Sequence, residues 1–105
     1  QRLMRQHWDT FLQPEHLDRL ARFGVTHVRI PVGYWLFSSI YQAADGFVAG
    51  GQAYLARALH WLQLRGMRAV IDLHAMPGGQ TANASFTGKM QPKAMFFLEK
   101  RHYMR

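Results

Sequence analysis

The sequence predicts an α/β fold built around a parallel sheet. The main observation is that a helical pattern, a glycine and a β-branched strand pattern follow one another in this order twice. Helices that alternate with strands indicate crossover connections, which join parallel strands. The second observation is composition: 49% of the 105 residues are hydrophobic and 18% are charged, which is typical of a chain that folds around a core.

The first unit begins with a helix that we predict over residues 14–23. Pro14 suits the first helical position, and apolar residues then recur at intervals of three and four. Gly24 follows where a left-handed C-terminal cap is common. Residues 25–30 form a β-branched run that predicts a strand, and Pro31 is expected to end it.

The second unit repeats this order. A helix is predicted over 52–65, with Gly66 at the capping position. The strand predicted over 67–74 is broken by the Pro-Gly-Gly sequence at 77–79. A further helix is expected near residues 1–7, before the first unit.

Polar side chains fall on one face of each predicted strand, near its C-terminal end. Arg29 lies on the first strand, and Asp72 and His74 lie on the second. This end of a parallel sheet is where ligands bind in α/β folds, so a binding role is one interpretation. The alternatives are structural: Arg29 could pair with Asp72 to fasten the sheet, and His74 could cap a loop.

The segment from Pro31 to Gly51 is long for a strand-to-helix connection and rich in aromatic residues. Flat aromatic faces suit the C–H faces of sugar rings, and they equally suit packing within the protein. Packing is favoured for Trp35, which is close to the strand. For Tyr41 and Phe47, sugar stacking and packing both stay open.

Charge and composition exclude several classes of function. The net charge is +7, but residues 89–105 hold five of the 13 Lys and Arg, so the basic character is concentrated in a short tail. No nucleic-acid motif accompanies it, and no apolar run approaches bilayer length, so we expect neither nucleic-acid nor membrane partners. The chain has no cysteine, no phosphate loop and no metal-ligand spacing, so no cofactor and no metal site are expected.

Three motifs in register resemble one family. Residues 7–11 (HWDTF), 24–35 (GVTHVRIPVGYW) and 71–80 (IDLHAMPGGQ) are similar in order and spacing to motifs of fungal-type exo-β-1,3-glucanases. These enzymes belong to glycoside hydrolase family 5, the cellulase-like group. The resemblance covers roughly residues 5–80. Residues 81–105 are expected to be an unmatched basic tail.

The resemblance implies a partial (β/α)8 TIM barrel, with about two βα units and a preceding helix within residues 1–80. It also implies a secreted or cell-wall enzyme that hydrolyses O-glycosidic bonds of β-glucans with retention. Arg29 and His74 match the residues with which the family lines the subsite for the cleaved sugar. The chain is expected to be a slice of a longer product, without its signal peptide.

Retaining hydrolysis needs two carboxylic acids about 5 Å apart, and the family supplies two glutamates from later strands. This chain lacks their Asn-Glu-Pro motif, and its two glutamates, Glu15 and Glu99, lie in a predicted helix and in the tail. No catalytic residue is therefore assigned, and the isolated chain is expected to be inactive. The alternative is a non-catalytic carbohydrate-binding remnant.

Overall fold

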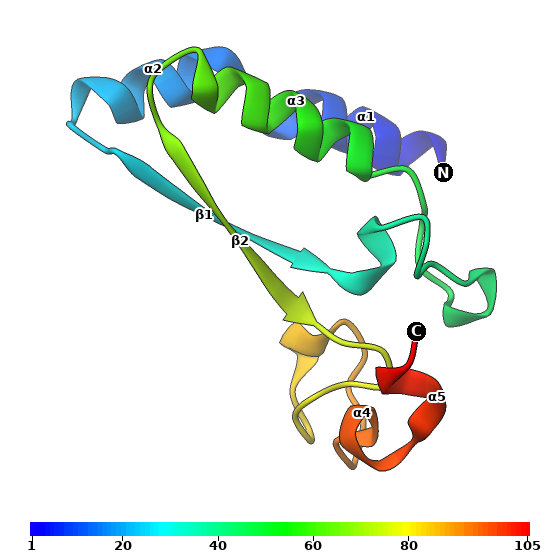
Figure 1. The fold of residues 1–105 in the computed structure, drawn as a ribbon. Helices are drawn as coiled ribbons and strands as arrows, with labels where there is room; N and C mark the ends of the chain where they lie inside the picture. Colours follow the sequence, from blue (N-terminus) through cyan, green and yellow to red (C-terminus); the bar gives the residue numbers. More distant parts are fainter.

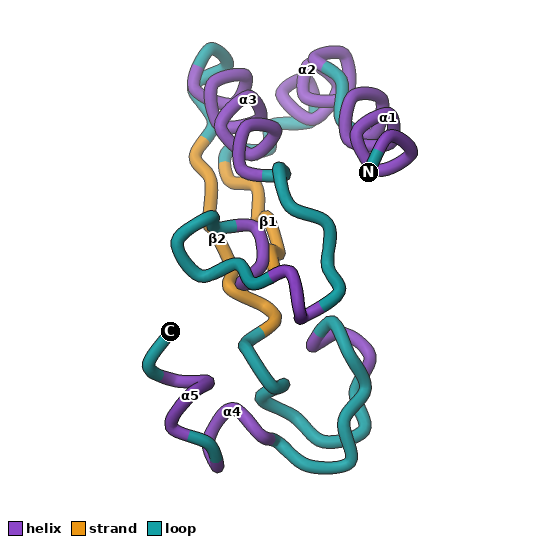
Figure 2. The backbone as a smooth tube through the Cα atoms, turned by 90° about the vertical axis from the view of Figure 1, so that its right-hand side faces the viewer, coloured by secondary structure: helices purple, strands orange, loops and turns teal.

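The structure, a computed structural model, describes residues 1–105 as helices on one side of two parallel strands (Figure 1). The helices α1–α3 form one layer, and the tail lies beyond the C-terminal end of β2 (Figures 1 and 2). The α-helices and strands are α1 (Arg2–Phe11), α2 (Pro14–Arg22), β1 (His27–Gly33), α3 (Gln52–Gln63), β2 (Arg68–Ala75), α4 (Met95–Leu98) and α5 (Lys100–Tyr103).

The two strands pair in parallel, as the repeated pattern predicts. Their register runs from His27 opposite Arg68 to Gly33 opposite Ala75. Helix α3 makes the crossover between them, so the second helix-glycine-strand unit has the predicted role. The observed fold is thus a small α/β domain with a two-stranded sheet.

Both predicted glycine caps are confirmed. Gly24 and Gly66 have φ angles of 77° and 65°, in the left-handed region that a side chain disfavours. At the other end of α2, Pro14 occupies the first turn, and the Gln13 backbone N–H donates to His16 Nδ1 at 3.2 Å. These local signals explain why the helix begins and ends where it does.

Most element boundaries lie within two residues of the prediction, and two differ by more. Strand β1 continues through Pro31 to Gly33 instead of ending at Pro31. Pro31 is tolerated because β1 has a partner on one side only, so a missing N–H on its open side breaks no hydrogen bond. Helix α1 reaches Phe11, beyond the predicted 1–7, and therefore contains the HWDTF motif.

The core lies between the helices and the first half of each strand. Leu17, Leu62 and Met67 are its buried members, with Leu17 and Leu62 each 1% exposed. Smaller partly buried residues of both strands, Val28 and Ala69 among them, pack against this cluster.

The apolar face of β2, which carries Ile71 and Leu73, is covered only in part. Ile71 and Leu73 remain 41% and 38% exposed, because no helix crosses that part of the strand. A groove of about 630 Å³ runs between β1 and the helices and is lined mainly by hydrophobic side chains. No helix has the length and apolar character needed to cross a bilayer.

Candidate functional site

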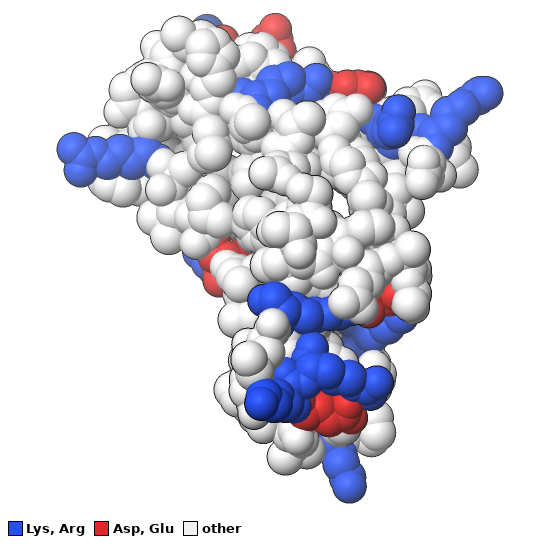
Figure 3. All heavy atoms as spheres, turned by 45° about the vertical axis from the view of Figure 1, so that its right-hand side comes forward, with Lys and Arg blue, Asp and Glu red and all other residues white.

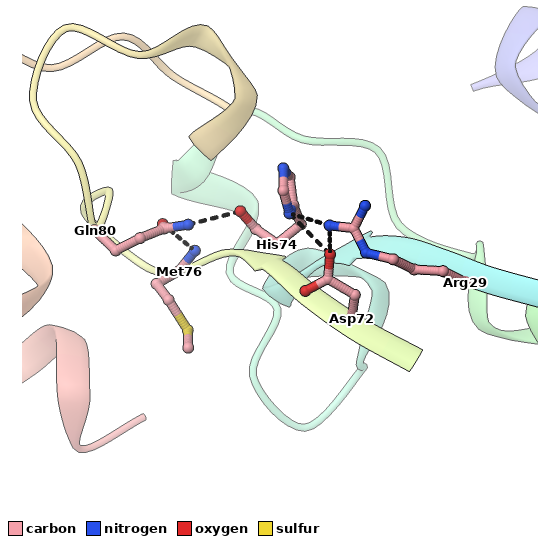
Figure 4. Close-up of polar contacts among 5 residues, drawn as sticks. All are labelled: Arg29, Asp72, His74, Met76 and Gln80. Carbon is pink, nitrogen blue, oxygen red and sulfur yellow. Dashed lines mark hydrogen bonds and ion pairs between the residues drawn. The ribbon is translucent and has the colours of Figure 1, made fainter. Parts of the chain in front are cut away.

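Arg29, Asp72 and His74 meet on one face of the sheet. The Arg29 guanidinium donates from Nη2 to Asp72 Oδ2, and the same oxygen lies 2.9 Å from His74 Nδ1 (Figure 4). Arg29 Nη2 is also 3.4 Å from His74 Nδ1. The structure therefore brings the two predicted binding residues together, through the carboxylate that the sequence analysis named as a possible partner of Arg29.

Strand geometry explains this meeting. Asp72 and His74 are two residues apart on β2 and so project from the same face, and Arg29 projects from that face of β1 because it pairs with Val70. The register slips between Val32 and Gly33, which leaves His74 without a partner in the ladder. Bulges of this kind redirect side chains and are common next to binding sites.

The cluster is open to solvent to different degrees. The side chains of Arg29, Asp72 and His74 are 60%, 25% and 38% exposed. Exposed ion pairs contribute little to stability, so the arrangement matters chiefly for how it places hydrogen-bonding groups. Donors on Arg29 and a ring nitrogen of His74 remain accessible to a polar ligand.

The turn after β2 is closed by Gln80, which the sequence analysis assigned no role. Its side-chain Nε2 donates to the His74 carbonyl at 2.6 Å, and its Oε1 accepts from the Met76 N–H at 3.0 Å (Figure 4). One amide side chain thus satisfies both ends of the turn and fixes the backbone of His74. A glutamine six residues after a strand-end histidine carries no distinctive pattern, so the sequence alone could not reveal this contact.

The predicted sugar-stacking aromatics lie in the loop that follows β1. Trp35 and Phe47 stack on each other, with ring centroids 3.8 Å apart and planes 10° apart. One face of each ring is therefore occupied by the other. The Tyr41 hydroxyl donates to the Phe47 carbonyl at 3.2 Å. This arrangement agrees with packing for Trp35, and sugar stacking by any of the three stays a prediction.

A different aromatic ring lies beside the polar cluster. The centroid of Phe86 is 5.3 Å from that of His74, with the planes tilted by 48°, and Phe86 is 53% exposed. Phe86 is thus an aromatic residue that contacts His74 and whose side chain is also exposed to solvent. Phe86 lies in the short 3-10 helix Ser85–Thr87, beyond the turn that follows β2, so no local pattern links it to His74.

The basic tail folds back onto the loop after β1. Arg105 donates to both carboxylate oxygens of Asp45, at 2.9 and 3.3 Å, and the Phe96 N–H donates to the Gly79 carbonyl at 3.1 Å. Lys and Arg side chains gather on this lobe (Figure 3). A hollow of about 440 Å³ lies between the tail, the loop after β1 and the turn after β2. The tail therefore lies at the same end of the sheet as the polar cluster.

The loop also holds a tyrosine with an altered acidity. Tyr34 is 5% exposed, directly after β1. Burial, with a further contribution from its hydrogen bond to Asp45, raises the pKa of Tyr34 to about 12. The phenol is therefore a neutral donor in the physiological pH range.

The polar cluster contains a single carboxylate. Asp72 stands alone in the cluster, whereas retaining hydrolysis needs two acids about 5 Å apart. Glu15 is on α2 in the helical layer and Glu99 is in the tail, at opposite ends of the molecule (Figure 1). The arrangement can bind and orient a polyhydroxylated ligand, and no group of three potential metal ligands lies together.

The sequence of this chain is similar to those of several known proteins. Glucan endo-1,6-beta-glucosidase B of Emericella nidulans is 33% identical over 97 residues, 91% of this chain and 24% of that protein. The probable endo-1,6-beta-glucosidase B of Aspergillus flavus is 36% identical over 95 residues, 90% of this chain and 24% of that protein. A probable glucan 1,3-beta-glucosidase A of Aspergillus fumigatus is 41% identical over 78 residues, 74% of this chain and 18% of that protein.

The chain is homologous to part of these fungal glucan β-glucosidases. It spans about a quarter of the length of the endo-1,6-β-glucosidases that it matches. The match to the Aspergillus flavus protein covers 90% of the 105 residues of this chain. A match of this length must extend past Gln80, so it includes part of residues 81–105. No protein-family profile matches the chain.

Proposed function

We propose that this chain forms the sugar-recognising strand ends of a retaining β-glucan glycosidase, with Arg29 and His74 binding the sugar beside the scissile bond. The observation that supports this most strongly is the convergence of the two side chains on one carboxylate, although 45 residues separate them. The names of the relatives support β-glucan as the substrate class, with β-1,3 or β-1,6 linkages.

The proposal includes a larger fold and a location. Strands β1 and β2 each have one unpaired edge, and the apolar groove beside β1 has the size to accept further side chains. These features suit two βα units of a (β/α)8 barrel, in which neighbouring strands pair with both edges. The whole enzyme would act outside the cell or in its wall, where β-glucans are found.

The two carboxylic acids that perform hydrolysis would come from outside these residues. Glu15 and Glu99 lie too far apart to act together, and Asp72 is engaged by Arg29 and His74. The 105-residue chain is therefore expected to bind β-glucan oligosaccharides without cleaving them. A non-catalytic carbohydrate-binding remnant would behave in the same way. The separation of Glu15 and Glu99 is the observation that favours this second candidate function.

Calorimetric titration with β-1,3- and β-1,6-linked glucose oligosaccharides tests the proposal. We expect binding that Arg29→Ala weakens roughly 10-fold or more, because a hydrogen bond from a charged group contributes about 1.5–3 kcal/mol. Arg68→Ala is the matched control, an exposed arginine at the opposite end of β2. Equal losses in the two variants, or release of glucose by the chain, would contradict the proposal.

A further inference from the structure

Asp72 is the centre of the polar cluster. Its Oδ2 receives the Arg29 guanidinium and lies 2.9 Å from His74 Nδ1, and its side chain is the least exposed of the three. Removing Asp72 would leave Arg29 and His74 facing each other without an acceptor between them. The carboxylate therefore decides how both binding groups are presented.

The contacts of His74 Nδ1 cannot both be hydrogen bonds when the ring is neutral. Asp72 can only accept at this position, which requires a proton on Nδ1, whereas Arg29 can only donate, which requires a lone pair there. The Asp72 contact is 2.9 Å and charge-assisted, and the Arg29 contact is 3.4 Å. The geometry therefore favours the Nδ1–H form, with Nε2 unprotonated.

We propose that Asp72 is a positioning residue that holds neutral His74 in the Nδ1–H form, so that Nε2 acts as a hydrogen-bond acceptor toward the ligand. Nε2 points away from Arg29 and Asp72 (Figure 4). The site then presents donors on Arg29 beside one acceptor on His74. The proposal deepens the proposed function, because it rests on that function for the identity of the ligand.

This pairing selects a particular ligand chemistry. One hydroxyl oxygen of the ligand accepts from Arg29, and a neighbouring O–H donates to His74 Nε2. Two adjacent free hydroxyls on one sugar ring satisfy both groups. A ring whose donating hydroxyl is methylated or removed leaves the Nε2 lone pair without a partner and is expected to bind more weakly. Asp72 thus contributes to specificity without touching the ligand.

Long-range ¹⁵N–¹H NMR of the His74 ring in the complete 105-residue chain tests the proposal directly. We expect the neutral ring of the unmodified protein to be mainly Nδ1–H, with Nε2 showing the shift of an unprotonated nitrogen. In Asp72→Ala we expect mainly Nε2–H, because Arg29 can then donate to Nδ1. Spectra at about pH 9, well above the unperturbed histidine pKa of about 6.5, sample the neutral form.

Asp9→Ala is the matched control. Like Asp72, Asp9 is an aspartate paired with an arginine, Arg57, but it lies on α1 in the helical layer. The Asp9→Ala substitution should leave the His74 ring signals unchanged. A mainly Nε2–H ring in the unmodified protein overturns the proposal, and this spectrum decides the matter even when the Asp72 variant does not fold.

Addition of the glucose oligosaccharides to the same samples separates this proposal from the proposed function. A mainly Nδ1–H ring without sugar binding would contradict the proposed function and leave the role of Asp72 standing. Sugar binding to a mainly Nε2–H ring would support the proposed function and contradict the role of Asp72. Sugar binding that moves the Nε2 signal of a mainly Nδ1–H ring is the result that both predict.

Discussion

At the scale of single residues, Tyr34 is the group whose chemistry the fold changes most clearly. Its phenol is buried against the stacked pair of Trp35 and Phe47, with centroids 5.3 and 5.8 Å away, and it shares Asp45 with Arg105. Burial and the bond to Asp45 both disfavour the phenolate, while Arg105 favours it. The balance keeps Tyr34 neutral.

We expect the Tyr34 phenol to ionise at about pH 12 in the folded chain, against a reference value of 10.0. Because the folded pKa is raised, the unfolded chain loses its proton first, and stability contributed by the neutral phenol is lost as pH rises from 10 toward 12. Phenolate absorbance, compared between the unmodified chain and Tyr34→Phe, isolates this titration. Ionisation of Tyr34 near its reference value of 10.0 would contradict the prediction.

The residues of the site show what sequence reasoning can and cannot reach. That Arg29 and His74 project from one face of the sheet could be predicted, because polar groups near strand ends stand out against a β-branched pattern. Gln80 and Phe86 could not, because their contacts with His74 depend on how the following loop folds back. That path is set by long-range packing, which leaves no periodic signal.

At the scale of elements, an ion pair joins the middle of α2 to a residue just after the C-terminal end of α3. Arg65, just after α3, donates from Nε to Asp18 Oδ1 at 2.7 Å and from Nη1 to the Trp61 carbonyl at 2.9 Å. The hydrogen bond from Arg65 holds the pKa of Asp18 below its reference value of 3.8, against a smaller opposing effect of burial. The pair therefore links the helices of the two repeated units.

This link predicts an acid sensitivity. Because the folded pKa of Asp18 is lowered, its contribution to stability is present above 3.8 and is lost as pH falls through the lower folded value. Denaturant midpoints should therefore fall more steeply below about pH 4 in the unmodified chain than in Asp18→Asn. Asp9→Asn, the matched exposed aspartate, should retain the steep fall, and parallel curves for all three proteins would contradict the prediction.

The boundaries of the elements were predictable to different extents. Glycine caps after α2 and α3 follow from backbone sterics and were placed correctly. The end of β1 was not, because whether Pro31 can lie within a strand depends on which edge of that strand is paired. Strand pairing is a property of the sheet and is absent from any local pattern.

At the scale of the whole molecule, little apolar surface is buried. Ten of the 105 residues are buried, and large hydrophobic side chains such as Val70 and Phe97 are at least half exposed. Hydrophobic burial is the main favourable contribution to folding, so the isolated chain should be only marginally stable. The α/β class was predictable from alternation, but this shortage of packing shows only in three dimensions.

The small core makes each of its members important. Leu62→Ala should lower the free energy of unfolding by about 2–5 kcal/mol, which approaches the whole stability of a small domain. Leu64→Ala is the matched control at the end of the same helix, where the side chain is 68% exposed, and it should change stability by less than about 0.5 kcal/mol. Urea unfolding followed by circular dichroism measures both, and similar losses would contradict the described core.

The most direct test of the central claim is a double-mutant cycle for binding of glucose oligosaccharides, with Arg29→Ala, His74→Ala and the double variant. If the two strand ends form one site, the losses should not add, and the double variant should bind about as weakly as the worse single variant. Fully additive losses, or no loss in either single variant, would show that Arg29 and His74 do not act on the same ligand.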